Sequence, residues 1–133
     1  MSDFLYHECG IAMIRLLKPL SYYQEKYGTA FYAMNKLYLM MEKQHNRGQD
    51  GAGVANIKFD VLPGTRYISR YRSNDKQAIK DIFGRMQAKF EEVGKENPEH
   101  LSDPEWLKKN VAFTGELWLG HLRYGTYGGN SIE

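Results

Sequence analysis

The chain has 133 residues, of which 42% are hydrophobic and 26% charged, values that suit one compact domain and exclude a disordered, collagen-like or coiled-coil protein. Its 18 Lys and Arg residues against 16 Asp and Glu give a formal charge of +2, too balanced for a protein that binds by neutralising many phosphates. The apolar runs are too short for a membrane span and no basic segment precedes them, so we expect a cytoplasmic protein with neither a nucleic-acid nor a membrane partner.

The first predicted elements are a strand and a helix. The apolar segment 11–17 halts before Pro19, which predicts a buried strand. Ser21 and Gln24 form a capping-box pattern, and apolar side chains then recur at helical spacing, so we predict one long amphipathic helix that ends near Gln44. We interpret the Met and Tyr side chains on its apolar face as core packing.

The middle of the chain predicts a hairpin or two neighbouring strands, and then a second helix. Two β-rich runs, 54–59 and 67–72, flank a Leu-Pro-Gly turn signal. Asn74 and Gln77 repeat the capping-box pattern, and the helix that follows should stop at Gly94.

The last part predicts a short helical turn and a final strand. Asp103, followed by proline, should open the turn, and residues 116–124 form a β-like run that enters a glycine-rich loop. The predicted order is strand, helix, strand, strand, helix, strand.

Three strings carry more polar or reactive groups than packing requires. Cys9, the single cysteine, precedes Gly10 at the start of the first strand, although a lone cysteine is more often an inert small hydrophobe. The string 44–53 places polar side chains among three glycines and suits either a solvated loop or a loop that folds over a site. The string 120–128 puts Arg123 inside a strand, where it needs an internal acid or an anionic ligand.

In chain order the strings read Cys-Gly-Ile, Gln-His-Asn-Arg-Gly-Gln-Asp-Gly-Ala-Gly and Gly-His-Leu-Arg-Tyr-Gly-Thr. Together they resemble the ordered signature of class II glutamine amidotransferase domains, which belong to the N-terminal nucleophile hydrolases, and most closely the amidophosphoribosyltransferase branch. The resemblance spans about residues 9–126. It implies an α+β fold, a four-layer αββα sandwich that is expected to be incomplete in this chain.

The resemblance implies roles for four residues. Cys9 would attack the side-chain amide of glutamine with its own α-amine as the base, which requires removal of residues 1–8 as a propeptide. Arg123 would clamp the α-carboxylate of glutamine, Thr126 would add a hydroxyl contact, and Arg47 would help to order the glutamine site.

The resemblance also implies that residues 9–133 are the amino-terminal part of a longer enzyme, with the oxyanion hole and a phosphoribosyltransferase domain downstream. We therefore expect this chain alone to be inactive. No cofactor is expected in this domain, and magnesium only in the transferase domain. Glutamine, that transferase domain and further copies of the chain in a homo-oligomer are the expected partners.

The ammonia would serve phosphoribosylamine formation in purine biosynthesis. Two alternatives stay open at this point: another class II amidotransferase with a different ammonia acceptor, and a non-catalytic regulatory or assembly module of the same fold.

Overall fold

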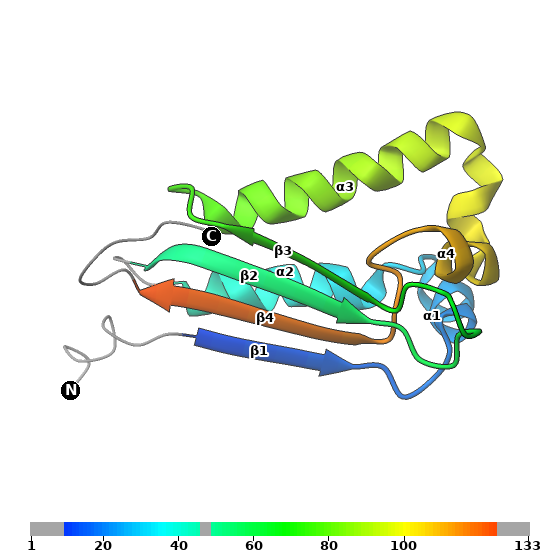
Figure 1. Ribbon diagram of the computed structural model, residues 1–133, viewed down its shortest axis with the longest axis horizontal. Helices are drawn as coiled ribbons and strands as arrows, with labels where there is room; N and C mark the ends of the chain where they lie inside the picture. The colour runs from blue at the N-terminus through cyan, green and yellow to red at the C-terminus, as the bar shows by residue number, and fades with distance from the viewer. Residues whose placement is uncertain (1–9, 46–48, 125–133) are drawn as a thin grey trace.

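The computed structural model describes residues 10–45 and 49–124, and Figure 1 shows them as one β-sheet with helices packed against it. All strand pairs are antiparallel, and the strand order is β1-β4-β2-β3. The strands are β1 Gly10–Arg15, β2 Gln49–Ile57, β3 Ile68–Ser73 and β4 Leu117–Tyr124. The helices are α1 Leu20–Tyr27, α2 Tyr32–Gln44, α3 Ala78–Glu96, the 3-10 helix η2 Pro98–Ser102 and α4 Pro104–Asn110.

The α+β class is confirmed, and β2 and β3 form the predicted hairpin. β2 begins at Gln49, so half of the polar string that suited a loop is a strand. Glycine and polar residues have low strand propensity, but here they pair with β4 as far as Gln49 opposite Tyr124. The partner strand is about 70 positions away along the chain, so local propensity does not predict this pairing.

The prediction of one long helix is wrong, because the chain breaks at Gly28. This glycine has a φ of 79° and its N–H donates to the Gln24 carbonyl at 2.9 Å, which closes α1 in the left-handed conformation that glycine adopts most readily. The predicted capping boxes are wrong as well. Pro19 caps α1 and Gln77 caps α3, neither with a side-chain hydrogen bond to the helix.

The helix α3 ends two residues later than predicted. The helix runs through Gly94 to Glu96, because the glycine permits close packing: a Cβ there would lie 2.8 Å from the Leu101 Cδ1 atom of η2. The predicted cap at Asp103 is confirmed, since its carboxylate accepts from the Trp106 N–H at 3.2 Å and opens α4.

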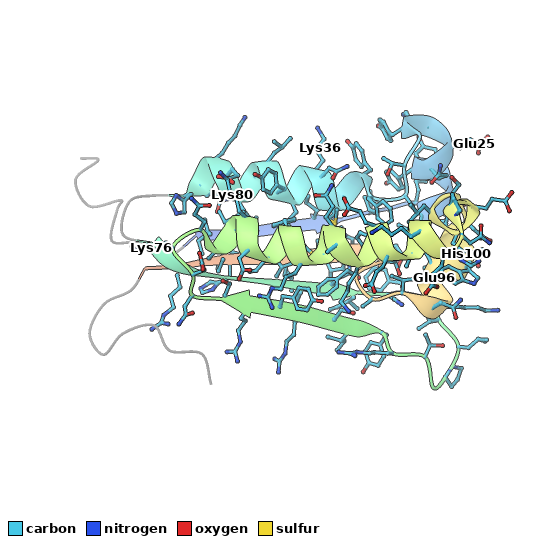
Figure 2. All side chains as sticks on the ribbon, turned by 90° about the horizontal axis from the view of Figure 1, so that it is seen from above. Glu25, Lys36, Lys76, Lys80, Glu96 and His100 are labelled. Carbon is cyan, nitrogen blue, oxygen red and sulfur yellow. The ribbon has the colours of Figure 1, made fainter. Side chains whose placement is uncertain are left out.

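One face of the sheet forms the core with the helices. Figure 2 shows α2 and α3 running side by side, with Lys36 on the first and Lys80 on the second. Fully or almost fully buried side chains of the strands and these helices pack together there: Ala12, Leu37, Met41, Val54, Ile82, Met86, Trp118 and Leu122. Burial of each large apolar side chain contributes about 1.5–3 kcal/mol.

The other face of the sheet is open in the described part of the chain. Ile11 is 72% exposed and Met13 60% exposed, so the prediction of a buried first strand is wrong at every second residue. Leu119 and Ile68 lie on the same open face. Residues 10–45 and 49–124 therefore form one sheet and one helical layer, and none of their helices is long and apolar enough to cross a membrane.

Candidate functional site at one end of the sheet

The sheet brings the three polar or reactive strings into one row. Leu122 of β4 pairs with Gly10 of β1 on one side and with Ala52 of β2 on the other, and Ala52 pairs in turn with Ser73 of β3. β1 and β2 begin at this end of the sheet and β4 ends there (Figure 1). Segments that are far apart in the sequence thus meet at one end of the sheet, as residues that share a site must do.

The first two strings also meet where the sheet packs against α2. A Cβ built on Gly10 would lie 2.8 Å from the Gln44 Oε1 atom and 3.4 Å from the Leu122 Cδ1 atom. Gln44 is the last residue of α2 and the first of the second string. The absence of a side chain at Gly10 therefore lets the end of α2 close over the residue that follows Cys9.

Arg123 is half-buried on the open face, next to a strand position without a side chain. It pairs in register with Gly51, and a Cβ at Gly51 would lie 3.5 Å from the Arg123 Cβ and 3.8 Å from its Cδ. The sheet also has an irregularity between Gln49 and Gly51. Such bulges re-aim side chains at functional edges, and a planar guanidinium held there suits bidentate binding of a carboxylate.

Arg123 is the predicted site residue that the structure places. Cys9, Arg47 and Thr126, the other three, lie outside the described residues.

The described sequence neighbours of these three residues lie together. Gly10, which follows Cys9, is in the common row, and Gln49 pairs with Tyr124, two residues farther along β4 than Leu122. Each of the three strings therefore has a described residue at the same end of the sheet: Gly10 in the first, Gln49 in the second and Tyr124 in the third.

A hydrogen-bonded cluster at this end of the sheet was missed by sequence reasoning. The Ser73 hydroxyl donates to Asp81 Oδ2 at 2.6 Å and accepts from the Asp75 N–H at 3.2 Å. Arg85 donates from Nη2 to the Arg72 carbonyl at 2.9 Å and lies 3.4 Å from Asp81 Oδ2. These bonds fix the junction of β3 and α3, and the i,i+4 spacing of Asp81 and Arg85 is its only sequence signal.

No group of three or more His, Cys, Asp and Glu residues within residues 10–45 and 49–124 is placed to hold a metal ion. The expectation that this domain needs no cofactor stays a prediction.

Comparisons of the chain with protein-family models, with curated proteins and with solved structures found no significant match. A functional assignment therefore depends on the three strings and on where the fold places them.

Proposed function

We propose that this chain contributes the glutamine-hydrolysing site of a class II glutamine amidotransferase of the N-terminal nucleophile hydrolase type. The observation that carries the proposal is the common row of Gly10, Leu122 and Ala52, in which the three strings of the resemblance lie on neighbouring strands. A chance match of short strings would not require them to meet in space.

The proposed chemistry begins at Cys9, after removal of residues 1–8. Its thiol attacks the carbonyl carbon of the glutamine side-chain amide, and its α-amine takes the thiol proton and passes it to the leaving ammonia. Water then cleaves the thioester, which releases glutamate and restores the thiol. An α-amine titrates near 7.7–8.0 and a thiol near 8.5, so the two groups exchange a proton readily near neutral pH. An amide nitrogen cannot act as this base, which is why the leader must be removed.

In this proposal Arg123 binds the α-carboxylate of glutamine. Its partial burial on the open face supports the assignment, because a guanidinium shielded in part from water binds a carboxylate more strongly, and Gly51 beside it lets the Arg123 side chain pack close to the backbone of β2. Thr126 would add a hydroxyl contact and Arg47 would order the same pocket.

The ammonia passes, in the proposed enzyme, to a phosphoribosyltransferase domain that forms phosphoribosylamine for purine biosynthesis. A second sheet would pack on the open face and complete the four-layer αββα sandwich. The exposed Ile11, Met13 and Leu119 side chains support this, because an apolar sheet face gains free energy when another layer covers it.

The test uses the full-length protein from its natural source and its Cys9→Ala variant. We expect the variant to lose glutamate release from glutamine while it keeps product formation from added ammonia, which bypasses Cys9. Retention of glutamine hydrolysis by Cys9→Ala would overturn the assignment of the nucleophile. Absence of glutamate release by the unaltered protein would instead favour the non-catalytic module.

A further inference from the structure

A cavity of about 420 Å³ lies at the opposite end of the sheet from the candidate site. It is formed where β1 leads into α1, where β2 leads toward β3, and beside α4. β1 begins in the site row with Gly10 and ends at the cavity with Arg15, which at a rise near 3.3 Å per residue separates the two places by roughly 16 Å. The proposed glutamine chemistry makes no use of this cavity.

An internal ion pair fixes one wall of the cavity. Lys108 Nζ lies 2.6 Å from Glu116 Oε2 and donates to the Phe59 carbonyl at 2.6 Å, and Glu116 Oε1 accepts from the Phe59 N–H at 2.9 Å. Both backbone groups of Phe59 are therefore held. These hydrogen bonds fix the wall. The charges of Lys108 and Glu116 neutralise each other, so the pair adds no net charge to the cavity.

The Arg15 guanidinium lies over the Phe59 ring of this wall, and its N–H groups are available to a ligand. Its guanidinium carbon lies 5.2 Å from the centroid of the Phe59 ring. No carboxylate of the described residues is within ion-pair distance of Arg15. A guanidinium whose face rests on an aromatic ring still offers the N–H groups along its edge, the geometry that binds phosphate or carboxylate oxygens in pairs.

The charges around the cavity favour a single anionic group. Lys18 and Lys109 join Arg15 in the lining, and neither forms an ion pair with a described carboxylate. Asp60 and Glu105 also line it, so beyond the Lys108 and Glu116 pair three cations face two carboxylates. The excess of positive charge attracts a ligand with one anionic group, and the two carboxylates disfavour a ligand with several anionic groups, such as a polyphosphate.

Apolar side chains occupy the remaining rim. Leu17 is 81% exposed and Leu62 67% exposed, and both line the cavity. Large apolar side chains left in water beside a cationic pocket suit a ligand with an apolar body attached to its charged group.

We propose that this cavity binds a small organic phosphate monoester. The phosphate lies against Arg15 with Lys18 and Lys109 nearby, and the organic body lies against Leu17 and Leu62. A dianionic phosphate uses the bidentate fork of Arg15 and both ammonium groups, whereas a single carboxylate uses fewer of these donors.

Titration of the full chain with phenyl phosphate, inorganic phosphate, benzoate and phenol tests the proposal, by calorimetry at 0.15 M salt. We expect one molecule of phenyl phosphate to bind per chain, more tightly than inorganic phosphate or benzoate, and phenol not to bind. Arg15→Gln should weaken phenyl phosphate binding roughly ten-fold or more, because it removes a charged hydrogen-bond donor. Arg70→Gln is the matched control, an exposed arginine on β3 away from the cavity, and should leave the affinity unchanged.

A second variant keeps the test independent of Arg15. Leu62→Ser should weaken phenyl phosphate but not inorganic phosphate. Tripolyphosphate is titrated as well, to detect a general attraction of polyanions. The proposal is overturned if Arg15→Gln and Arg70→Gln lose equal affinity for phenyl phosphate, or if benzoate binds as tightly as phenyl phosphate. It is also overturned if tripolyphosphate binds more tightly than inorganic phosphate to both Arg15→Gln and Arg70→Gln. The last result would show a general attraction of polyanions to the basic surface. None of these outcomes depends on glutamine hydrolysis.

Discussion

Arg123 and Arg70 both occupy open-face positions of the sheet, but their surroundings differ. Arg123 is half-buried beside Gly51 in the row where the three strings meet, whereas Arg70 is exposed on β3, the edge strand beyond β2. The same side chain is therefore shielded in part from water at one position and solvated at the other.

If the proposed function holds, we expect Arg123→Lys in the full-length protein to impair the use of glutamine and to spare synthesis from free ammonia. Loss of one partner of a charged hydrogen-bonded pair costs about 2–5 kcal/mol, which is roughly 30-fold to several thousand-fold in kcat/KM for glutamine. Lysine restores the charge but not the bidentate fork. The check is steady-state kinetics with each nitrogen donor.

Arg70→Lys serves as the control and should leave both activities unchanged. If Arg123→Lys instead lowers the glutamine and ammonia activities equally, Arg123 supports the fold and does not bind the substrate.

Lys58 is a buried cation whose effect on stability depends on pH. Its Nζ donates to the Lys108 carbonyl at 2.6 Å. Burial lowers the pKa of Lys58 from 10.5, and the neighbouring Lys108 and Arg66 cations lower it further, while Glu116 opposes them. Between the lowered folded-state pKa and 10.5 the unfolded chain holds more protons, so Lys58 makes the free energy of unfolding rise with pH in that window.

We predict that Lys58→Met abolishes this alkaline rise. The measurement is urea denaturation of both proteins at a series of pH values up to 10.5. The difference between their free energies of unfolding isolates the effect of Lys58, because the tyrosines are the same in both proteins. A difference that does not change with pH would contradict the account.

At the scale of elements, the junction before β4 depends on one side chain and one glycine. Asn56 of β2 is fully buried, and its amide donates to the carbonyls of Gly115 and Leu117 at 3.1 and 3.2 Å and accepts from the Gly115 N–H at 2.7 Å. A Cβ at Gly115 would lie 2.6 Å from the Lys58 backbone nitrogen, which no side-chain rotation relieves. Glycine is needed here for close backbone approach.

Gly115→Ala should therefore lower the free energy of unfolding by at least about 2 kcal/mol, because backbone has to move to make room. Gly84→Ala in the middle of α3 is the matched control. A Cβ at Gly84 meets nothing within 4 Å, and alanine there should raise stability by about 1 kcal/mol through helix propensity. Urea denaturation checks both, and equal effects of the two substitutions would refute the steric explanation.

The elements that sequence predicts best are those with a local signal. The Asp103 cap and the 54–59 and 67–72 hairpin runs follow from local patterns and are confirmed. The break at Gly28 is local as well, because the glycine closes α1 in the left-handed conformation, but the helical spacing of the apolar residues on both sides hides it. The strand character from Gln49 depends on pairing with β4, which outweighs propensity.

The candidate site divides in the same way. The motif predicts Arg123, because an arginine within a strand needs an anionic partner. Sequence cannot show that Gln44 closes over Gly10, or that Ser73 bonds to Asp81, since these contacts join different elements and follow no spacing rule.

At the scale of the whole molecule, the open sheet face is the largest departure from a closed core. Ile11 and Met13 point away from the helices on β1, the strand at the sheet edge. An exposed apolar face and an unpaired strand edge both favour association. Arg70 lies exposed on the same face and repels the Arg70 residues of other copies.

We therefore predict that the 133-residue chain self-associates, more strongly as salt screens the arginines. Sedimentation velocity over a range of protein concentrations should show dimers or larger species, and Ile11→Lys should reduce them. Leu39→Lys, at an exposed position on α2, is the control and should not. A monomer at every concentration and salt level would contradict this prediction.

In the proposed function Cys9, freed of residues 1–8, is the nucleophile of a glutamine site. Mass spectrometry of the full-length protein from its natural source, after treatment with an electrophilic diazoketone analogue of glutamine, tests it most directly. We expect one adduct, on Cys9 as the amino-terminal residue. Excess glutamine should prevent its formation, and Arg123→Lys should slow it. Full glutamine turnover by protein that still carries residues 1–8, or an adduct that glutamine does not prevent, would contradict it.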